Sequence, residues 1–171
     1  MRRRKLLRGL LGLTAAAAGF KLFGGERNAV EEKSMSPSGN EIETIEKSEA
    51  EWRERLSPEA FRVLRKEGTE PPGSSPLNDE KREGAYVCAG CALPLFESRW
   101  KYESGTGWPS FYDYIDGHLG FKKDFKLIWP RTEYHCARCG GHQGHVFDDG
   151  PEPTGKRYCN NGVALRFEPA A

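Results

Sequence analysis

The pattern of hydrophobic and polar positions divides the chain into an apolar N-terminal run, a polar stretch, a short helical region and a long strand-rich segment. Helical spacing begins near Ser48, which can cap a short helix that carries Trp52. A second helix is indicated where Ser57 precedes Pro58, and we expect Gly68 to close it. The sequence therefore predicts two short helices ahead of the strands.

After residue 84 the pattern changes to short runs of aromatic and β-branched residues, separated by Gly, Pro and Asp. No long helical period interrupts these runs. The predicted strands are 85–88, 111–115, 126–129, 132–136, 145–147, 157–160 and 163–167. Six or seven short strands in about 85 residues predict a mainly β fold, either an antiparallel sandwich or a barrel-like body.

The N-terminal apolar run has the features of an export signal. Residues 1–25 hold six of the 26 basic residues and none of the 25 acidic ones. The uncharged run 9–20 is shorter than the about 20 apolar residues of a membrane span. Residues 3–8, Arg-Arg-Lys-Leu-Leu-Arg, resemble a twin-arginine signal. We therefore expect residues 1–25 to direct export to the periplasm; an uncleaved membrane anchor, or an organellar presequence or cytoplasmic location, is the alternative.

The remaining chain is organised as a linker and one domain. Residues 26–47 are rich in Gly, Ser, Glu, Asn and Lys, a composition that predicts a flexible linker. Residues 48–171 are then one domain, as the total of 171 residues allows. The whole chain carries a net charge of +1, which argues against a nucleic-acid partner bound through charge.

Four of the five cysteines form two Cys-x-x-Cys pairs, Cys88 with Cys91 and Cys136 with Cys139. Two thiols three residues apart on a turn point at one ion, and two such turns complete a tetrahedral ligand set. We therefore predict one structural Zn²⁺ that clamps two distant hairpins and has no open position for catalysis. An iron site, two disulfides or redox-active pairs are the alternatives.

The fifth cysteine, Cys159, stands apart from these pairs. In an extended chain, Arg157 and Asn161 lie on the same face as its thiol. A neighbouring guanidinium lowers the pKa of a thiol and raises its thiolate fraction, which favours a nucleophile. A buried structural cysteine remains the alternative.

A nucleophile needs a proton donor, and His142 and His145 lie three residues apart. A straight strand would place them on opposite faces, so they share a pocket only if the chain turns, which Gly144 permits. Trp108 follows a Gly-rich turn and could form the wall of a site for a methyl-sulfur group. Surface or metal-binding histidines and a core tryptophan are the alternatives.

Together these motifs resemble the B-type peptide-methionine (R)-sulfoxide reductases. The resemblance extends from about residue 48 to residue 167. It is carried, in order, by Thr-Glu-Pro-Pro at 69–72, the first cysteine pair, Ser-Gly-Thr-Gly-Trp-Pro-Ser-Phe at 104–111, the second cysteine pair, His-x-x-His-Val-Phe at 142–147, Asp-Gly-Pro at 149–151 and Pro-Thr-Gly-x-Arg-Tyr-Cys at 153–159.

The resemblance implies a fold, a reaction and a set of site residues. The fold would be two antiparallel sheets with peripheral helices, called β-tent or Mss4-like. A thiolate would attack the sulfur of methionine (R)-sulfoxide in an oxidised protein, and an acid would protonate the departing oxygen. The implied catalytic positions are Cys159, His145, His142 and Asn161; the substrate-binding positions are Trp108, Phe147 and Arg157; the zinc ligands are Cys88, Cys91, Cys136 and Cys139.

Two positions depart from the pattern of this family. Thr106 stands where many members carry a resolving cysteine, so we expect an external thiol such as a thioredoxin-like protein to reduce the enzyme. Gly73 stands where many relatives have an aromatic residue, so the loop there can pack differently. We further expect a monomer. A zinc-knuckle binding module with an inert Cys159, or a secreted disulfide protein, is the competing interpretation.

Overall fold

The computed structural model describes residues 42–126 and 129–171, so the predicted leader and most of the predicted linker lie outside the described residues. The helices are α1 (Glu49–Arg55) and α2 (Pro58–Lys66), with single 3₁₀ turns η1 (Pro76–Asn78), η2 (Ser98–Trp100) and η3 (Gly162–Ala164). The strands are β1 (Gly84–Cys88), β2 (Pro94–Glu97), β3 (Lys101–Tyr102), β4 (Ser110–Phe111), β5 (Leu119–Asp124), β6 (Arg131–Cys136), β7 (His142–Phe147), β8 (Arg157–Asn160) and β9 (Leu165–Pro169).

The two predicted helices are confirmed, and local capping explains where they begin. At α1 the side chain of Ser48 accepts from the N–H of Glu51, whose carboxylate accepts from the N–H of Ser48. At α2 the Ser57 side chain accepts from the N–H of Ala60. Helix α2 ends at Lys66, and its C-cap residue Glu67 adopts the left-handed conformation, one residue before the predicted Gly68. In the described part of the chain, no helix is long and apolar enough to cross a bilayer.

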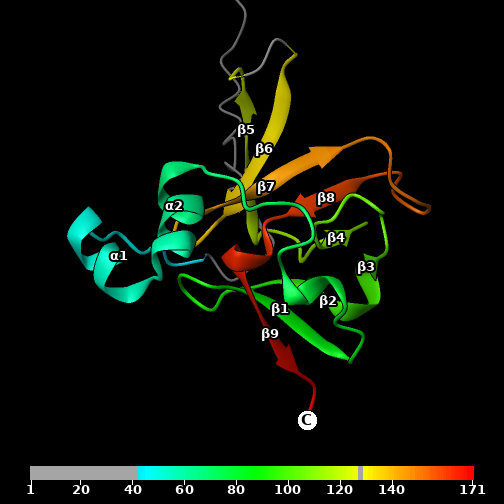
Figure 1. Cartoon of the computed structure of the whole chain (residues 1–171), viewed down its shortest axis with the longest axis horizontal. Coiled ribbons are helices and arrows are strands. Elements are labelled where there is room, and N and C mark those ends of the chain that lie inside the picture. Colours follow the sequence, from blue (N-terminus) through cyan, green and yellow to red (C-terminus); the bar gives the residue numbers. More distant parts are fainter. Residues whose placement is uncertain (1–41, 127–128) are drawn as a thin grey trace, which may run out of the picture. The chain divides into compact units, whose positions relative to one another are not determined.

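The strands form two antiparallel sheets, as predicted. One sheet has the order β2-β1-β9 and the other has the order β3-β4-β8-β7-β6-β5 (Figure 1). The predicted strand 157–160 agrees with β8, and 85–88, 132–136 and 145–147 fall within β1, β6 and β7. The fold class expected from the sequence is therefore confirmed.

Two strand predictions were wrong in part. The predicted strand 126–129 is not among them, because residues 127 and 128 lie outside the described residues. The predicted strand 111–115 shrinks to β4. The segment 163–167 begins with a 3₁₀ turn before β9. Strand β5 was missed because its residues 121–123 are exposed and two of the three are lysines, so it has little hydrophobic pattern. The short strands β2 and β3 were missed as well.

The core lies between the two sheets and beneath α2. Phe96 of β2 stacks on Phe111 of β4 with ring centroids 4.2 Å apart, which joins the two sheets. Helix α2 contacts β7 and η3, and Figure 1 shows it beside β7. The end of the predicted linker also packs here, because Ile42 and Ile45 contact the core and the N–H of Ile45 donates to the carbonyl of Arg138 at 2.7 Å. Residues 42–47 therefore extend the folded domain.

Candidate active site and metal centre

The two cysteine pairs come together at the ends of strands from different sheets. Cys88 ends β1 and Cys136 ends β6, and the partner of each lies in the turn that follows. All four Sγ atoms lie within 4.8 Å of one another, with 3.7 Å from Cys88 to Cys139 and 3.5 Å from Cys91 to Cys136. A tetrahedron of sulfurs at about 2.3 Å from a metal has edges of about 3.8 Å. The cluster therefore fits one tetrahedral metal ion.

The surroundings of this cluster also suit a metal. Cys88, Cys136 and Cys139 are buried. The Nε2 of Gln143 donates to the Sγ of Cys88 at 3.4 Å, the kind of neighbouring hydrogen bond that orients a thiolate ligand. Because the ligands come from the β1–β2 and β6–β7 turns, an ion held here ties the two sheets together.

Cys159 lies in a row of side chains that crosses the larger sheet. Its register partners are Ser110 of β4 on one side and His145 of β7 on the other. The row continues from His145 to Glu133 of β6 and Lys122 of β5. Residues opposite each other on antiparallel strands project to the same face, with Cβ atoms about 4.5–5.5 Å apart. The fold therefore brings the thiol and one imidazole together.

A β-bulge brings the second imidazole to the same face. The pairing of β6 with β7 passes from Tyr134 opposite Gly144 to His135 opposite His142, so β7 contains one extra residue, Gln143. The extra residue reverses the alternation of side chains, and the rings of His142 and His145 lie 5.5 Å apart. The chain does not turn at Gly144, which pairs in the strand; the bulge at the preceding Gln143 brings the two histidines together.

Gly144 is required for a different reason. A Cβ atom at this position would lie 1.9 Å from the carbonyl oxygen of Cys159 on the neighbouring strand. Only glycine therefore lets β7 approach β8 this closely. The approach keeps the His145 and Cys159 strands in register.

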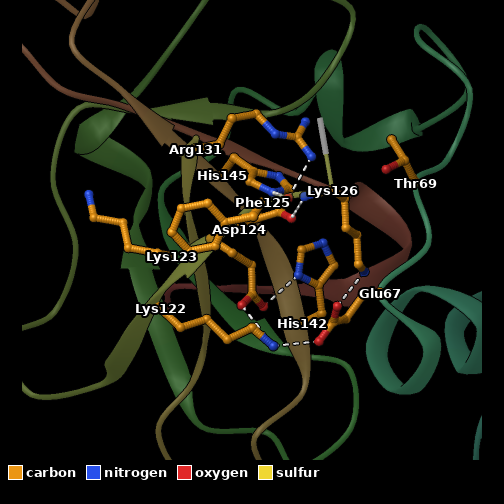
Figure 2. Close-up of a pocket in the computed structure, with 11 residues that line it drawn as sticks. Glu67, Thr69, Lys122, Lys123, Asp124, Phe125, Lys126, Arg131, His142 and His145 are labelled. Carbon is orange, nitrogen blue, oxygen red and sulfur yellow. Dashed lines mark hydrogen bonds and ion pairs between the residues drawn. The ribbon is translucent and has the colours of Figure 1, made fainter. Parts of the chain in front are cut away.

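Each imidazole is held by a carboxylate from another strand of the same sheet, Glu133 from the adjacent β6 and Asp124 from β5, one strand further away. The Nδ1 of His142 lies 2.7 Å from Oε1 of Glu133, and the Nε2 of His145 lies 2.7 Å from Oδ2 of Asp124. Both histidines face one cavity of about 430 Å³, and Figure 2 shows them there together with Asp124. Cys159 is not among the residues that line this cavity and lies one strand further across the sheet.

The pKa values of both carboxylates are lowered, so both are ionised. Two opposing effects set the pKa of the His145 imidazole. The backbone N–H of Lys126, with His145 and Arg131, holds the pKa of Asp124 well below its usual range. Burial favours a raised pKa for Glu133, but the hydrogen bonds from His142 and Lys122 outweigh it, and the pKa is lowered. Burial lowers the pKa of His145, and the hydrogen bond to Asp124 partly restores it.

The thiol of Cys159 is half-buried, and burial raises its pKa above the usual value. The positive charge of Arg157 and hydrogen bonding from Thr106 and Arg157 act in the opposite direction. The expected effect of Arg157 is therefore present, but the expected net lowering of the pKa of Cys159 was wrong. Desolvation depends on tertiary packing, which the local sequence does not contain.

Arg157 is held beside Cys159 by two contacts. Its Nε and Nη2 each donate to Asp149 at 2.8 Å, a bidentate ion pair, and this pairing raises the pKa of the guanidinium. Its Cζ lies 4.4 Å from the ring centroid of Phe147, its register partner on β7. Arg157 and Phe147 therefore share the face of Cys159 and flank it.

Trp108 and Asn161 meet at the segment 69–72. The Nε1 of Trp108 donates to the carbonyl of Glu70 at 3.1 Å, so the indole is anchored at one edge and half-buried. Asn161 is buried; its Oδ1 accepts from the N–H of Glu70 at 3.0 Å and its Nδ2 donates to the carbonyl of Gln143 at 2.9 Å. Asn161 therefore links the anchor of the indole to the strand that carries the histidines.

Sequence reasoning missed the acidic partners of this site. Glu133 and Asp124 alternate with Arg131 and Lys122 along two strands, a pattern of paired charges that could have indicated them. Glu70 lies in the quoted Thr-Glu-Pro-Pro motif but received no role. Its carboxylate accepts from the N–H groups of Gly162 and Val163 at 2.5 and 2.9 Å. It thereby fixes the turn that follows Cys159.

A β domain that gathers four thiols at one centre and keeps a fifth beside an imidazole has the organisation of a thiol-dependent oxidoreductase. Comparison with known proteins agrees, since a SelR domain matches residues 56–169. The chain is 54% identical over 125 residues to "Peptide methionine sulfoxide reductase MsrB" of Methanosarcina barkeri, covering 72% of this chain and 88% of that protein. The chain belongs to the SelR family of MsrB-type peptide methionine sulfoxide reductases.

Two further relatives come from distant organisms. An MsrB of Leptospira interrogans is 49% identical, with 72% of this chain and 95% of that protein covered. "Peptide methionine sulfoxide reductase B1, chloroplastic" of Arabidopsis thaliana is 46% identical, with 78% of this chain and 70% of that protein covered. The SelR match covers most of the described domain, and the first 55 residues lie outside it.

Proposed function

We propose that this protein reduces methionine (R)-sulfoxide residues in proteins to methionine, with Cys159 as the nucleophile. Reduction of methionine sulfoxide in proteins follows from membership of the MsrB family. The observation that supports Cys159 is its pairing across the sheet with His145, whose imidazole is held by Asp124. A thiol and a proton donor on one face are what the reaction needs.

Cys159 and the side chains around it have different roles in the chemical step. The Cys159 thiolate attacks the sulfoxide sulfur, while a proton from His145 goes to the sulfoxide oxygen. The oxygen leaves the methionine sulfur and ends on the cysteine sulfur, so methionine departs and Cys159 becomes a sulfenic acid. Asp124 and Glu133 hold the imidazoles of His145 and His142 in place.

The groups around the thiol bind the substrate. The indole of Trp108, anchored on Glu70, offers an apolar surface for the substrate methyl group. Arg157 and Phe147 flank Cys159 on the same face and stabilise the thiolate and the apolar part of the substrate respectively. Asn161 positions the segment that holds the indole.

Regeneration of the enzyme requires an external reductant. The other four cysteines form the metal cluster, and Thr106 occupies the position expected for a resolving thiol. One external thiol condenses with the sulfenic acid, giving a mixed disulfide and water, and a second thiol releases reduced Cys159. A thioredoxin-like dithiol supplies both thiols, and we propose that the enzyme works as a monomer with such a partner.

The test of this function is turnover of separated R and S epimers of a methionine sulfoxide peptide, with a small dithiol as reductant. We expect reduction of the R epimer only, and complete loss of turnover in Cys159→Ser with the metal content unchanged. For the acid, His145→Gln is expected to lower kcat about 10²-fold or more. The matched control is His118→Gln, because His118 contacts the carbonyl of Pro94 away from the site. Retained turnover in Cys159→Ser would refute the assigned nucleophile.

We also propose that the ion in the cysteine cluster is Zn²⁺. Four thiolates with tetrahedral spacing are a closed donor set, which suits a structural zinc ion and leaves no position for substrate. Metal analysis of the purified protein should give one zinc per chain. An iron content of one per chain, with visible colour, would replace zinc by a rubredoxin-like site.

The location of the protein is a separate proposal that rests on residues 1–25. Their basic start and apolar run of export-signal length support transport to the periplasm, with residues 26–47 joining this leader to the domain. Fusion of residues 1–47 to a reporter, in strains with and without twin-arginine transport, tests it. Substitution of Arg3 and Arg4 by lysine should abolish export, and export that persists would contradict the twin-arginine assignment.

A further inference from the structure

Three hydroxyl groups lie in a chain beside Cys159. Ser110 is its register partner on β4, and the Ser110 side chain is fully buried. The Oγ of Ser110 lies 2.7 Å from the Oγ of Ser104, which in turn lies 2.8 Å from the Oγ1 of Thr106. The chain thus leads from Ser110 through Ser104 to Thr106, and Thr106 is one of the groups that lower the pKa of Cys159. The Ser110 end of the chain therefore lies opposite Cys159 on the neighbouring strand.

The far end of the chain is fixed by a backbone carbonyl. The hydroxyl of Ser110 donates to the carbonyl of Trp108 at 3.1 Å. When Cys159 is a neutral thiol, its S–H can donate to Thr106, Thr106 to Ser104, and Ser104 to Ser110. Every hydroxyl hydrogen then has an acceptor.

The same three groups can serve the ionised form of Cys159. A thiolate has no hydrogen and needs a donor. Each hydroxyl hydrogen rotates about its own C–O bond, so Thr106 can turn its hydrogen to the sulfur and accept from Ser104 instead. No heavy atom has to move, and no proton passes between the oxygens. The hydrogen bond to a charged sulfur is stronger than the one to the neutral thiol, so the chain favours the thiolate.

We propose that Thr106 takes part in the reaction: its hydroxyl, oriented by Ser104 and Ser110, donates a hydrogen bond to the thiolate of Cys159. This inference rests on Cys159 being the nucleophile of the proposed function. It assigns a positive role to the residue that stands in place of a resolving cysteine. Half-burial disfavours the thiolate, and Thr106 together with Arg157 offsets part of that cost.

Other charged and titratable groups also influence the ionisation of the thiol, and a test must keep them constant. They are Arg157, Asp149, His145, Tyr102 and Tyr134. All of them are unchanged by substitutions at Thr106. A change in the pKa of Cys159 in a Thr106 variant therefore measures the effect of the Thr106 hydroxyl on the thiol.

The experiment measures the pKa of Cys159 from the pH dependence of its alkylation by iodoacetamide, with Cys159→Ser as the blank for the other thiols. Thr106→Val removes the hydroxyl and keeps the branched shape, and it should raise the pKa by about one unit. Thr106→Ser restores a hydroxyl and should return the pKa to near the wild-type value. An unchanged pKa in Thr106→Val would overturn the proposal.

A double-mutant comparison tests whether Ser104 acts through Thr106. Ser104→Ala should shift the pKa of Cys159 in the wild-type background and leave it unchanged in the Thr106→Val background. Equal shifts in both backgrounds would refute the chain. Alkylation needs no substrate. If the variants show these pKa shifts but the wild-type protein does not reduce the R epimer, the proposed function alone is contradicted. In active enzyme, the acid limb of the kcat/KM profile should move to higher pH with Thr106→Val.

Discussion

Replacement of Asp124 by asparagine isolates the contribution of one carboxylate to the acid of the site. Asp124 accepts from Nε2 of His145 at 2.7 Å and from Arg131 at 2.6 Å. The carboxylate raises the pKa of His145, against burial, which lowers it. Asparagine removes the raising contribution and leaves the charge of Arg131 without its partner. Both changes lower the pKa of His145.

The size of this effect follows from the hydrogen bond that is lost. A hydrogen bond to a charged group contributes about 1.5–3 kcal/mol, and one pKa unit corresponds to about 1.4 kcal/mol. His145 and Asp124 retain some exposure, at 14% and 8% of their side chains, so we take the lower figure and expect a fall of about one unit. If protonated His145 supplies the proton, the alkaline limb of kcat/KM moves to lower pH by the same amount.

Two measurements check the expectation independently. The kcat/KM profile with the R epimer gives the alkaline limb, and proton NMR titration of the His145 ring gives its pKa without substrate. Asp148→Asn is the matched control, since Asp148 is 84% exposed and pairs with Lys156 instead of a histidine. An alkaline limb that stays in place in Asp124→Asn, while the NMR pKa falls, would show that His145 is not the acid.

Three other predictions follow from the same geometry. Cys136→Ser should lose the metal and lower the thermal midpoint by on the order of 10 °C, measured by metal analysis and calorimetry; an unchanged midpoint would remove the structural role of the ion. Gly144→Ala should lower the unfolding free energy by more than about 2 kcal/mol and reduce turnover, because the new Cβ meets the Cys159 carbonyl at 1.9 Å; denaturant titration would reveal a strand that tolerates it. After one turnover with substrate and no reductant, thiol labelling and mass spectrometry should find Cys159 oxidised with no new disulfide in the chain, and an internal disulfide would identify a resolving partner.

Local sequence was sufficient wherever the cause of a structure lies within a few residues. The serine caps placed both helices, because a cap bonds to a backbone group three residues away. The spacing within each Cys-x-x-Cys pair indicated a turn with two ligands, and the tertiary structure brings the pairs together as expected. The alternating stretch 157–160 was found as a strand, with Arg157 and Cys159 on one face.

The order of the sheet and the partners of the site depend on residues far apart in the chain. Strand β5 has exposed lysines and no apolar pattern, yet it supplies the carboxylate that holds His145. The bulge at Gln143 places two histidines on one face, and it arises from the pairing of β7 with β6. Neither feature has a signal within its own segment.

The sequence by itself determined the helices, most of the central strands, the two cysteine pairs of the cluster and the separate position of the fifth cysteine, because each follows from residue type and short-range spacing. Only the tertiary structure decided which carboxylates hold the histidines and which way the pKa of Cys159 shifts. The physical reason is that desolvation and cross-strand contacts are set by neighbours tens of residues away, which come together when both sheets have formed around the core.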